Sequence, residues 1–375
     1  MKSYLSLALL LCLQLNAMSL FRAYPSLKQS IPIAPIANLP TPITPCTQLE
    51  RALHHPHLYM KNDAMTGTDG LYGGNKVRKL QFLLGDAKKH NAKTIVTYGC
   101  FGTNHGLATA CYANKLGYDC ILMLKPQPNT HVVRNNLLLD HYFGATIQIF
   151  PDNDTRNAAR EALLQADSDA YFFPTGGSIP LGALGFVNAA FELKEQIDQG
   201  LMPEPDYIYI ALGSAGTTAG LLLGLKLAGL HSKICAIAVE PEETLNEFEE
   251  NVYKLFAGTN ELLREHDANI PHVEFPHDQI IFNKTLMGPD YGVWIPEGDA
   301  AMRVMQETEK IELEGTYSAK AVAAIIADLK NGVRKADDVI LFWNTYCGLD
   351  FSHLTRQVQY QDLNPEFHVL FAMQA

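Results

Sequence analysis

Several common site-forming motifs are absent from this 375-residue sequence. Its seven cysteines include no C-x-x-C pair and are scattered along a large chain, which argues against a zinc knuckle or a disulfide scaffold. No H-E-x-x-H sequence is present. The neighbouring histidines His54, His55 and His57 are more typical of a solvated loop than of a metal site. The sequence therefore predicts no metal centre.

Positive charge is also scarce. The 29 Lys and Arg residues are outnumbered by 40 Asp and Glu residues, so the formal net charge is −11, and there is no basic block or tail. This balance argues against nucleic acid as a partner. Hydrophobic residues make up 47% of the chain, which can therefore bury a large core, and the length suggests two or more domains.

Long apolar runs are missing except at the N terminus. Lys2 precedes a short apolar run and then the small residue Ala17, which together resemble a signal peptide of residues 1–17. The run is too short to span a bilayer comfortably, and no other segment is long and apolar enough, so no stable membrane span is expected. The pattern favours export to the periplasm or the medium, whereas a true start at Met18 would indicate a cytoplasmic protein.

Strand-like and helix-like segments alternate after residue 76. Apolar residues with helical spacing run from Arg78 to His90, and helices are expected after the glycine-containing turns that end near 106 and 220. Short strand-like runs occur at 94–98, 120–124, 145–150, 207–212, 234–239 and 339–343. Strands that alternate with helices predict an α/β fold with parallel sheets and helices on both faces.

The first notable turn is Gly73-Gly74-Asn75-Lys76-Val77-Arg78-Lys79-Leu80, just before a predicted helix. Glycines let the backbone approach a ligand closely or adopt positive φ. A lysine at the start of a helix can act as an amine nucleophile or contact a phosphate. A surface turn that opens a basic helix would have a similar sequence.

A second turn, Gly213-Ser214-Ala215-Gly216-Thr217-Thr218-Ala219-Gly220, lies between a predicted strand and a predicted helix. Its backbone N–H groups could hold a phosphate. It matches neither G-x-x-x-x-G-K-[ST] nor G-x-G-x-x-G, which argues against a nucleotide P-loop and an NAD-dependent oxidoreductase. A cup for one phosphate monoester fits, although an ordinary tight turn would also explain the sequence.

Other strand-end turns carry hydroxyl, amide and imidazole groups. Thr103-Asn104-His105 follows one predicted strand, where parallel α/β sheets bind their ligands, although a plain helix cap explains it equally well. Tyr291 and Tyr317 lie in glycine-containing turns, and Thr345 follows the last predicted strand. One explanation joins these features: Lys76 forms a Schiff base with pyridoxal 5′-phosphate, and the cup holds its phosphate.

These motifs resemble those of the 1-aminocyclopropane-1-carboxylate deaminase / D-cysteine desulfhydrase family. The matching segments follow one another in the family's order from about Leu20 to the end of the chain: 59–61, 73–80, 102–105, 174–177, 181–186, 213–220, 288–292 and 316–320. The resemblance implies a two-domain, tryptophan-synthase-β-like fold (fold type II) and a homodimer. It also implies a large cofactor-binding domain of residues 18–78 plus 188–375 and a small α/β domain of residues 79–187.

The resemblance implies a role for each site residue. Lys76 would be the Schiff-base lysine, and Asn104 would bond the cofactor's ring oxygen or phosphate. The phosphate would be held by Lys79, Gly213, Ser214, Ala215, Gly216 and Thr217. The substrate would be faced by Thr103, Asn104, His105, Tyr291 and Tyr317, with Lys76, Thr103 and the two tyrosines acting in catalysis.

The sequence departs from the family pattern at two places. Thr103 stands where the family usually has a serine that contacts substrate, so the hydroxyl is kept but a methyl is added. Tyr346-Cys347 replaces small residues after Thr345 and could narrow the site.

Two positions near the pyridine nitrogen separate the activities of the family, and here they are Ser318 and Thr345. Deaminases that open the cyclopropane ring tend to carry Glu and Leu there, whereas desulfhydrases carry small hydroxyl residues. A carboxylate would favour the protonated ring and strengthen it as an electron sink. The two hydroxyls favour a desulfhydrase that converts D-cysteine to pyruvate, sulfide and ammonia.

Two alternatives stay open. One is a 1-aminocyclopropane-1-carboxylate deaminase, which would release 2-oxobutanoate and ammonia. The other is a non-catalytic protein that binds a small molecule on the same fold, since fold does not determine function.

Overall fold

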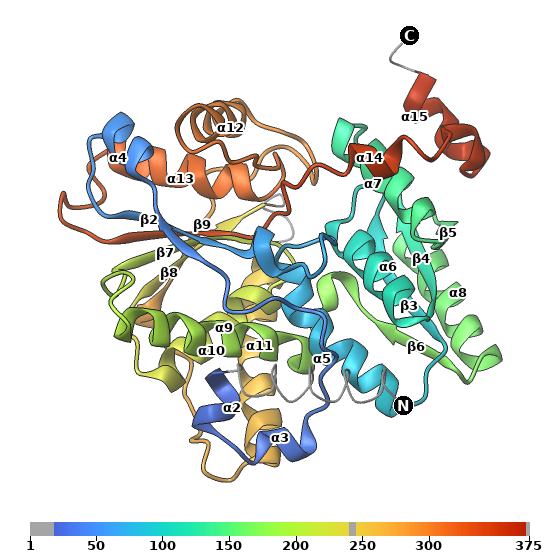
Figure 1. The fold of residues 1–375 in the computed structure, drawn as a ribbon, viewed down its shortest axis with the longest axis horizontal. Helices are drawn as coiled ribbons and strands as arrows, with labels where there is room; N and C mark the ends of the chain where they lie inside the picture. The colour runs from blue at the N-terminus through green and yellow to red at the C-terminus, as the bar shows by residue number, and fades with distance from the viewer. Residues whose placement is uncertain (1–18, 240–244, 373–375) are drawn as a thin grey trace.

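The computed structural model describes residues 19–239 and 245–372 and contains two β-sheets flanked by helices (Figure 1). The predicted signal peptide of residues 1–17 lies outside the described residues. The larger sheet has the strand order β1 (Ile43–Pro45), β2 (Leu58–Asn62), β10 (Ile340–Asn344), β7 (Tyr207–Leu212), β8 (Lys233–Ala238) and β9 (Ile280–Asn283). The smaller has the order β5 (Thr146–Ile149), β4 (Asp119–Lys125), β3 (Thr94–Cys100) and β6 (Ala170–Phe173).

Every strand pair in these sheets is parallel except β1 with β2. Parallel neighbours need a crossover connection, and helices supply these crossovers here. The predicted α/β class with parallel sheets is therefore confirmed.

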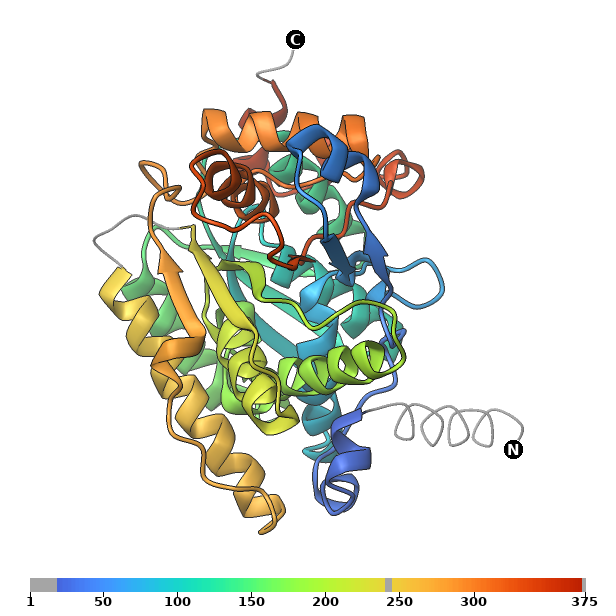
Figure 2. The ribbon, with the colours of Figure 1, turned by 90° about the vertical axis from the view of Figure 1, so that its left-hand side faces the viewer.

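Helices cover both faces of the larger sheet, as the two perpendicular views show (Figures 1 and 2). One face is covered by α9 (Pro180–Asp198), α10 (Gly216–Ala228) and α11 (Leu245–His266), with the short helices α2 (Ser19–Ala23) and α3 (Leu27–Ser30) nearby. The other face is covered by α4 (Thr47–Leu53), α12 (Pro296–Thr308) and α13 (Ser318–Lys330).

The smaller sheet is enclosed in the same way. One face packs against α5 (Asn75–Lys89), α6 (Asn104–Leu116) and α7 (His131–Tyr142), and the other against α8 (Asn153–Ala166). The C-terminal helices α14 (Ser352–Thr355) and α15 (His368–Ala372) lie beside the α7 end of this part (Figure 1). Short 3-10 helices are η1 (Asp63–Thr66), η2 (Thr175–Gly177), η4 (His277–Gln279), η5 (Tyr360–Asp362) and η6 (Pro365–Phe367).

Successive strand residues alternate between two apolar cores. In β7, Ile208 and Ile210 belong to the core shared with α9 and α10, whereas Tyr209 belongs to the core under α13. In β3, Ile95 packs toward α6 and Val96 toward α8. Strands buried on both faces have nearly continuous apolar sequences, and that is why the sequence predicted them.

The predicted helix starting at Arg78 in fact begins three residues earlier. Helix α5 starts at Asn75, directly after Gly74, whose φ is +92°. Lys76 therefore lies within the first helical turn rather than in the preceding loop. Arg78 is two residues further, on the opposite face of the helix, because each residue turns the helix by about 100°.

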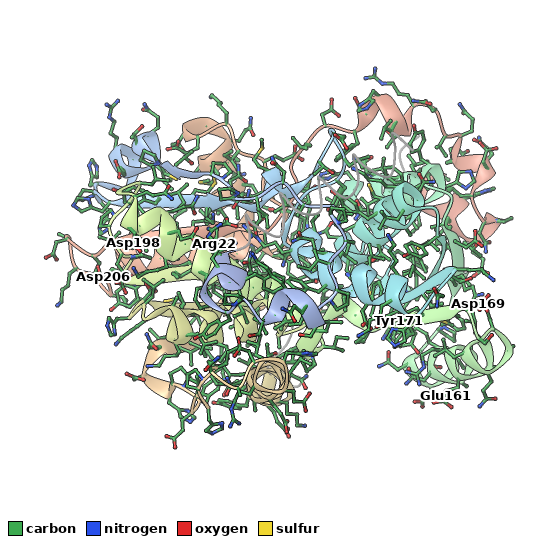
Figure 3. The ribbon with its side chains drawn as sticks, turned by 60° about the horizontal axis from the view of Figure 1, so that its bottom comes forward. Arg22, Glu161, Asp169, Tyr171, Asp198 and Asp206 are labelled. Carbon is green, nitrogen blue, oxygen red and sulfur yellow. The ribbon has the colours of Figure 1, made fainter. Side chains whose placement is uncertain are left out.

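The side chains labelled in Figure 3 divide between the two parts of the molecule. Arg22, Asp198 and Asp206 lie on the part with the larger sheet, and Glu161, Asp169 and Tyr171 on the part with the smaller one. Among residues 19–239 and 245–372, none of the helices is both long and apolar enough to cross a membrane.

Candidate active site

A cavity of about 360 Å³ lies where the carboxyl ends of β3, β4, β7 and β10 meet. Ligands of parallel α/β sheets bind at such edges. Most of the predicted site residues line it: Lys76, Thr103, Asn104, His105, Gly213, Ser214, Ala215, Thr217, Tyr291, Tyr317 and Thr345. Lys79, Gly216 and Ser318 lie in its immediate surroundings but do not line it. The cavity thus joins turns that are remote in sequence.

Lys76 is placed by a glycine that approaches the opposite wall closely. A side chain at Gly74 would put its Cβ 3.0 Å from the Thr345 carbonyl oxygen, and the Asn75 N–H donates to that same oxygen at 3.0 Å. These contacts tie the start of α5 to the end of β10. Burial lowers the pKa of Lys76 to about 8, so roughly a tenth of its amine is uncharged at pH 7, far more than for an ordinary lysine.

Lys79 lies one turn further along α5, on the same side as Lys76. Its Nζ donates to the Gly176 carbonyl oxygen at 3.1 Å and to the Ser178 hydroxyl at 3.0 Å. Burial, together with the nearby charge of Lys76, lowers the pKa of Lys79 well below its usual range. An anion placed next to these two lysines would reverse that effect.

The turn from Gly213 to Thr217 forms a compact cup at the start of α10. The Ser178 hydroxyl donates to the Ser214 hydroxyl at 2.8 Å, and Asn75 Nδ2 donates to the Thr217 hydroxyl at 3.1 Å. Ala215 adopts φ of +65°, a conformation that is unfavourable for residues other than glycine. The observed strain supports a functional turn rather than an ordinary connection.

Thr103, Asn104 and His105 lie at the start of α6. The Thr103 hydroxyl accepts a hydrogen bond from the Gly106 N–H at 3.1 Å, so it caps the helix as well as lining the cavity. The Asn104 side-chain oxygen accepts from the Tyr72 hydroxyl at 3.1 Å and from Asn136 Nδ2 at 3.2 Å. Both the cap explanation and the site explanation of this turn are therefore compatible with the geometry.

His105 is buried and uncharged. Burial and the charges of Lys76 and Lys79 lower the pKa of His105 well below its usual range. The Thr97 hydroxyl donates to the Phe173 carbonyl oxygen at 2.8 Å, so His105 Nε2, 3.0 Å from that hydroxyl, is the nitrogen that donates to it. His105 Nδ1 then carries the lone pair, and it has no hydrogen-bond partner.

Tyr291 and Tyr317 form a hydroxyl pair on the cavity wall. Their hydroxyl oxygens are 2.7 Å apart, and their rings meet edge to face with centroids 6.2 Å apart. Burial, followed by the neighbouring Tyr317, raises the pKa of Tyr291 well above its usual range. The Tyr291 hydroxyl is therefore protonated near neutral pH and can donate or relay a proton.

Ser318 and Thr345, the two residues expected near the pyridine nitrogen, are placed differently. Thr345 lines the cavity. The Ser318 hydroxyl instead accepts from the Glu314 N–H at 2.8 Å and lies 3.3 Å from the Glu314 carbonyl oxygen. The carboxylate of Glu314 lines the cavity in its own right and accepts from the N–H groups of Thr316 and Tyr317.

The sequence analysis missed several charged residues of the wall, including Lys125, Arg156, Asp290 and Glu314. Lys125 is the last residue of β4, so its position at a strand end was a usable signal. Arg156 and Glu314 come from a helix and from a turn, and no sequence pattern marks them as cavity residues. The second departure, Tyr346-Cys347, contributes Tyr346 to the wall, while the Cys347 sulfur accepts a hydrogen bond from the Gly73 N–H.

Comparison with known proteins decides the family. Residues 36–345 match the family described as pyridoxal-phosphate dependent enzyme. The chain belongs to this family. A D-cysteine desulfhydrase of Serratia proteamaculans is 31% identical over 332 residues, which cover 85% of this chain and 96% of that protein. A D-cysteine desulfhydrase of Klebsiella pneumoniae is also 31% identical, over 80% of this chain and 90% of its own length.

A solved structure of a related protein has the same fold as this pyridoxal-phosphate enzyme. The crystal structure of a homologue of 1-aminocyclopropane-1-carboxylate deaminase has a TM-score of 0.72 and 27% identity, and the match covers 92% of this chain and 98% of that one. The predicted resemblance, fold type and cofactor are confirmed by these comparisons.

The residues present fit pyridoxal 5′-phosphate. The Thr218 hydroxyl is buried in the cup without a hydrogen-bond partner, and a side chain at Gly216 would meet Lys79 Nζ at 3.0 Å and the Ser178 hydroxyl at 2.7 Å. The first N–H groups of α10 have no acceptors within the helix. An unpaired hydroxyl, a nearby lysine and a helix N terminus are suited to a phosphate dianion.

Proposed function

We propose that this pyridoxal-phosphate enzyme is a lyase that acts on a small amino acid, with D-cysteine as the substrate. One observation carries the proposal: a single cavity joins the low-pKa amine of Lys76, the cup at α10 and the start of α6. The relatives named D-cysteine desulfhydrase support the choice of substrate. The hydroxyl of Thr345 on the cavity wall also supports it.

We propose that Lys76 Nζ holds the cofactor, while the Gly213–Thr217 cup, with Lys79 behind it, binds the phosphate. When bound, pyridoxal phosphate supplies an aldehyde that captures amino groups and a ring that accepts the electron pair left on the α-carbon. The backbone N–H groups at the start of α6 and the Thr103 hydroxyl would bind the substrate carboxylate.

The proposed reaction moves one proton and breaks one carbon–sulfur bond. Lys76 Nζ, or a relay through Thr103 or the Tyr291–Tyr317 pair, takes the α-proton as general base. The sulfur leaves the β-carbon with the bonding electron pair as hydrosulfide. Water then hydrolyses the resulting enamine to pyruvate and ammonia.

The test is a product assay of the purified enzyme with D-cysteine, L-cysteine and 1-aminocyclopropane-1-carboxylate. Sulfide and pyruvate from D-cysteine, without 2-oxobutanoate from the cyclopropane amino acid, are expected. Cofactor absorbance without any product would instead support a non-catalytic protein. Lys76→Ala is expected to lower the turnover at least about a hundredfold, because it removes the general base and the cofactor attachment.

A second candidate is 1-aminocyclopropane-1-carboxylate deaminase, and the carboxylate of Glu314 favours it. This side chain is 4% exposed and lines the cavity, so a carboxylate is present even though Ser318 and Thr345 are not acidic. Burial raises the pKa of Glu314. Under this candidate, Glu314→Gln abolishes 2-oxobutanoate formation, whereas sulfide release from D-cysteine would survive the substitution if the first candidate is right.

Three further proposals rest on the family resemblance. We propose a domain division into residues 18–78 plus 188–375 and residues 79–187, a homodimer, and removal of residues 1–17 on export. Light scattering during size-exclusion chromatography tests the dimer. N-terminal sequencing of the mature protein tests the cleavage, and an intact Met1 or a start at Met18 would contradict it.

A further inference from the structure

Arg156 is a buried cation on the wall of the cavity. The residue is 7% exposed. Its Nη2 donates to Asn153 Oδ1 at 2.9 Å and its Nη1 to the Gly99 carbonyl oxygen at 3.3 Å, while the guanidinium lies 4.0 Å from the centre of the Tyr98 ring. These contacts hold the side chain in one position. Its Nε has no hydrogen-bond partner.

Within residues 19–239 and 245–372, no ion pair compensates this buried charge. Among the described residues, no carboxylate oxygen lies within 4.0 Å of the Arg156 guanidinium. Burial lowers the pKa of Arg156. A buried guanidinium without a counter-ion is unfavourable unless a ligand supplies the negative charge.

Lys125 is a second cation on the cavity wall, next to the end of β3. It is the last residue of β4 and lies opposite Cys100 of β3 in the sheet. Cys100 directly follows Gly99, whose carbonyl oxygen accepts a hydrogen bond from Arg156. Lys125 lines the cavity and has no ion pair within 4.0 Å in the described part of the chain. Hydrogen bonds from the Thr155 N–H and hydroxyl, and to a smaller extent the charge of Lys125, lower the pKa of the nearby Asp152.

The acidic groups of the cavity are engaged elsewhere. Asp290 Oδ1 accepts from the Tyr291 N–H at 2.7 Å, and Glu314 accepts from the N–H groups of Thr316 and Tyr317. The other titratable groups of the wall near Arg156 are Cys100 and Tyr291. Neither carboxylate pairs with Arg156 or Lys125, the two cations that line the cavity at the ends of β3 and β4 in the described part of the chain.

The proposed function already has a binding place for each of its two required anions. The cofactor phosphate is assigned to the cup at α10, and the substrate carboxylate to the start of α6. Neither assignment uses Arg156 or Lys125. Two cations on a cavity wall thus remain without a ligand.

We propose that Arg156 and Lys125 form a subsite for a negatively charged substrate side chain, so that the enzyme acts on amino acids whose β-substituent is an oxyanion. The proposal rests on the proposed lyase function and extends it from hydrosulfide to larger anionic leaving groups. For a phosphate ester, the α-proton is removed and the Cβ–O bond breaks with its electron pair leaving on phosphate. Water hydrolyses the enamine to pyruvate and ammonia.

The test compares matched neutral and charged ligands of the holoenzyme. Binding of D- and L-aspartate and of D- and L-asparagine is measured by the change in cofactor absorbance, and pyruvate release is measured with O-phosphoserine and O-acetylserine. The enzyme is expected to prefer the charged member of each pair. Arg156→Gln is expected to weaken aspartate binding and the kcat/KM for O-phosphoserine roughly tenfold or more, with little change for the neutral ligands.

Arg160→Gln is the matched control on the same helix. Like Arg156, Arg160 places its guanidinium over an aromatic ring, 5.2 Å from the Phe172 ring centre. Unlike Arg156, it pairs with Glu161 and does not line the cavity. It is expected to leave the charged-to-neutral preference unchanged. If Arg156→Gln fails to fold, Lys125→Gln removes the other cation at a less buried residue, and Arg156→Lys, which keeps the charge, is expected to retain the preference for charged ligands.

The outcomes separate the inference from the function on which it rests. Equal losses for aspartate and asparagine in Arg156→Gln would mean that Arg156 binds the α-carboxylate, and would overturn the subsite. No preference for charged ligands in the unaltered enzyme would overturn it too. If no amino acid changes the cofactor absorbance and none yields a keto acid, the lyase function itself fails.

Discussion

Lys76 is the residue on which the proposed chemistry depends. Burial lowers its pKa from an ordinary value of 10.5 to about 8. Only an uncharged amine can attack the cofactor aldehyde. We therefore expect the rate at which the cofactor-free protein takes up pyridoxal phosphate to rise with pH up to about 8 and then to level off, as followed by visible absorbance in a stopped-flow experiment.

The variant Lys76→Arg serves as the control for this pH dependence, because it keeps a cation at the site but has no nucleophilic amine at these pH values. It should bind the cofactor without developing the absorbance of the covalent form. A wild-type rate that rises only near pH 10 would show that burial does not lower the pKa of this amine.

Asp140 is a buried carboxyl group that lowers the free energy of unfolding as pH rises. It lies in α7 at 0% exposure, and neither carboxylate oxygen has a hydrogen-bond partner among the residues that the structure describes. Burial raises the pKa of Asp140 well above 3.8. The folded state therefore retains a proton that the unfolded state releases, so the free energy of unfolding falls as pH rises from about 4 toward the raised pKa.

Asp140→Asn keeps the shape and removes this titration. We expect the variant to be more stable than the wild type at pH 7 by about 1–3 kcal/mol, with a smaller difference at pH 4. Urea unfolding at the two pH values measures both. Asp119→Asn, an exposed substitution at the start of β4, is the control and should change neither value. A difference that does not depend on pH would contradict the assignment.

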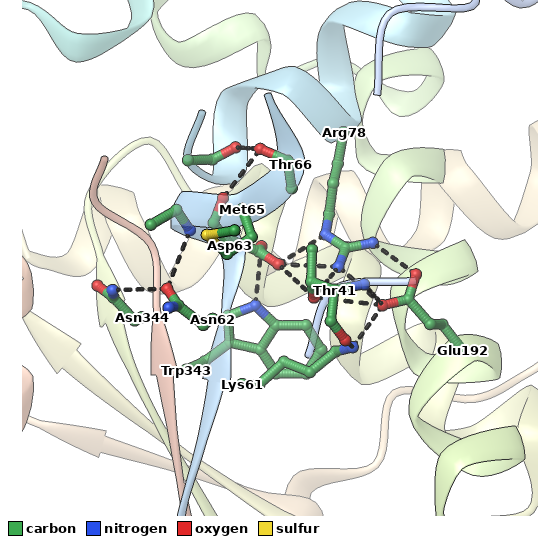
Figure 4. A network of polar contacts seen from close by, with 12 residues as sticks. Thr41, Lys61, Asn62, Asp63, Met65, Thr66, Arg78, Glu192, Trp343 and Asn344 are labelled. Carbon is green, nitrogen blue, oxygen red and sulfur yellow. Dashed lines mark hydrogen bonds and ion pairs between the residues drawn. The ribbon is translucent and has the colours of Figure 1, made fainter. Parts of the chain in front are cut away.

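At the scale of elements, one ion network holds α5, α9 and the β2 segment together (Figure 4). Arg78 Nε donates to Asp63 at 2.9 Å, Arg78 Nη1 donates to Glu192 at 3.0 Å, and Lys61 also pairs with Glu192. Trp343 from β10 donates to the second oxygen of Asp63 at 2.9 Å. Since Arg78 lies on the face of α5 opposite Lys76, the network holds the helix that presents Lys76 to the cavity.

The charges of this network balance, so removal of one should be costly. Burial alone would raise the pKa of Glu192, but Arg78 and Lys61 outweigh it and lower this pKa to about 2. Glu192→Gln would leave two cations with one carboxylate, and we expect it to destabilise the fold by about 3–5 kcal/mol. Thermal unfolding followed by circular dichroism measures this.

Glu195→Gln on the same helix is the control, since Glu195 pairs with Arg22 at the surface and should contribute less than about 1 kcal/mol. The depressed pKa also gives a pH dependence. The stabilisation by Glu192 is fully present above about pH 4.5 and is lost as pH falls toward 2. A similar loss of stability in both variants would show that the buried network stabilises the fold no more than a surface ion pair does.

At the scale of the whole molecule, the cavity is walled by both sheets. Thr103 follows β3 of the smaller sheet, and Gly213 and Thr345 follow β7 and β10 of the larger one. A ligand bound there contacts both parts and stabilises the folded state by mass action. Removal of pyridoxal phosphate should therefore lower the melting temperature by several degrees, measured by differential scanning fluorimetry.

Inorganic phosphate should restore part of this stability to the cofactor-free protein, because the proposed cup binds phosphate alone. The same addition should have less effect in a Gly216→Val variant, whose side chain would enter the space next to Ser178 and Lys79 Nζ. Equal stabilisation of both proteins would place the phosphate elsewhere.

Much of the fold was predicted from the sequence alone. The runs 207–212 and 94–98 became β7 and β3 with the same start, because strands buried on both faces have continuous apolar sequences that local reading detects. The start of α5 was missed, because Gly74 lets the helix begin three residues before its apolar periodicity becomes visible.

The candidate site was predictable where it follows strand ends. Lys76, the Gly213 turn and the Thr103 turn carry glycine and hydroxyl signals, and parallel sheets bring such ends to one edge. Arg156 and Glu314 carry no such signal. Ser318 was expected near the ring nitrogen, but its hydroxyl bonds the backbone of Glu314, a detail set by the local path of the turn.

The sequence by itself thus determined the order of strands and helices, the glycine turns and the family, since these depend on residues close together along the chain. Only the tertiary structure decided which charges share the cavity. Within the described residues, it put Arg156 on the cavity wall without a carboxylate partner and Lys79 behind the Gly213–Thr217 cup. The reason is physical: burial and charge pairing depend on contacts between segments remote in sequence, and local patterns do not encode them.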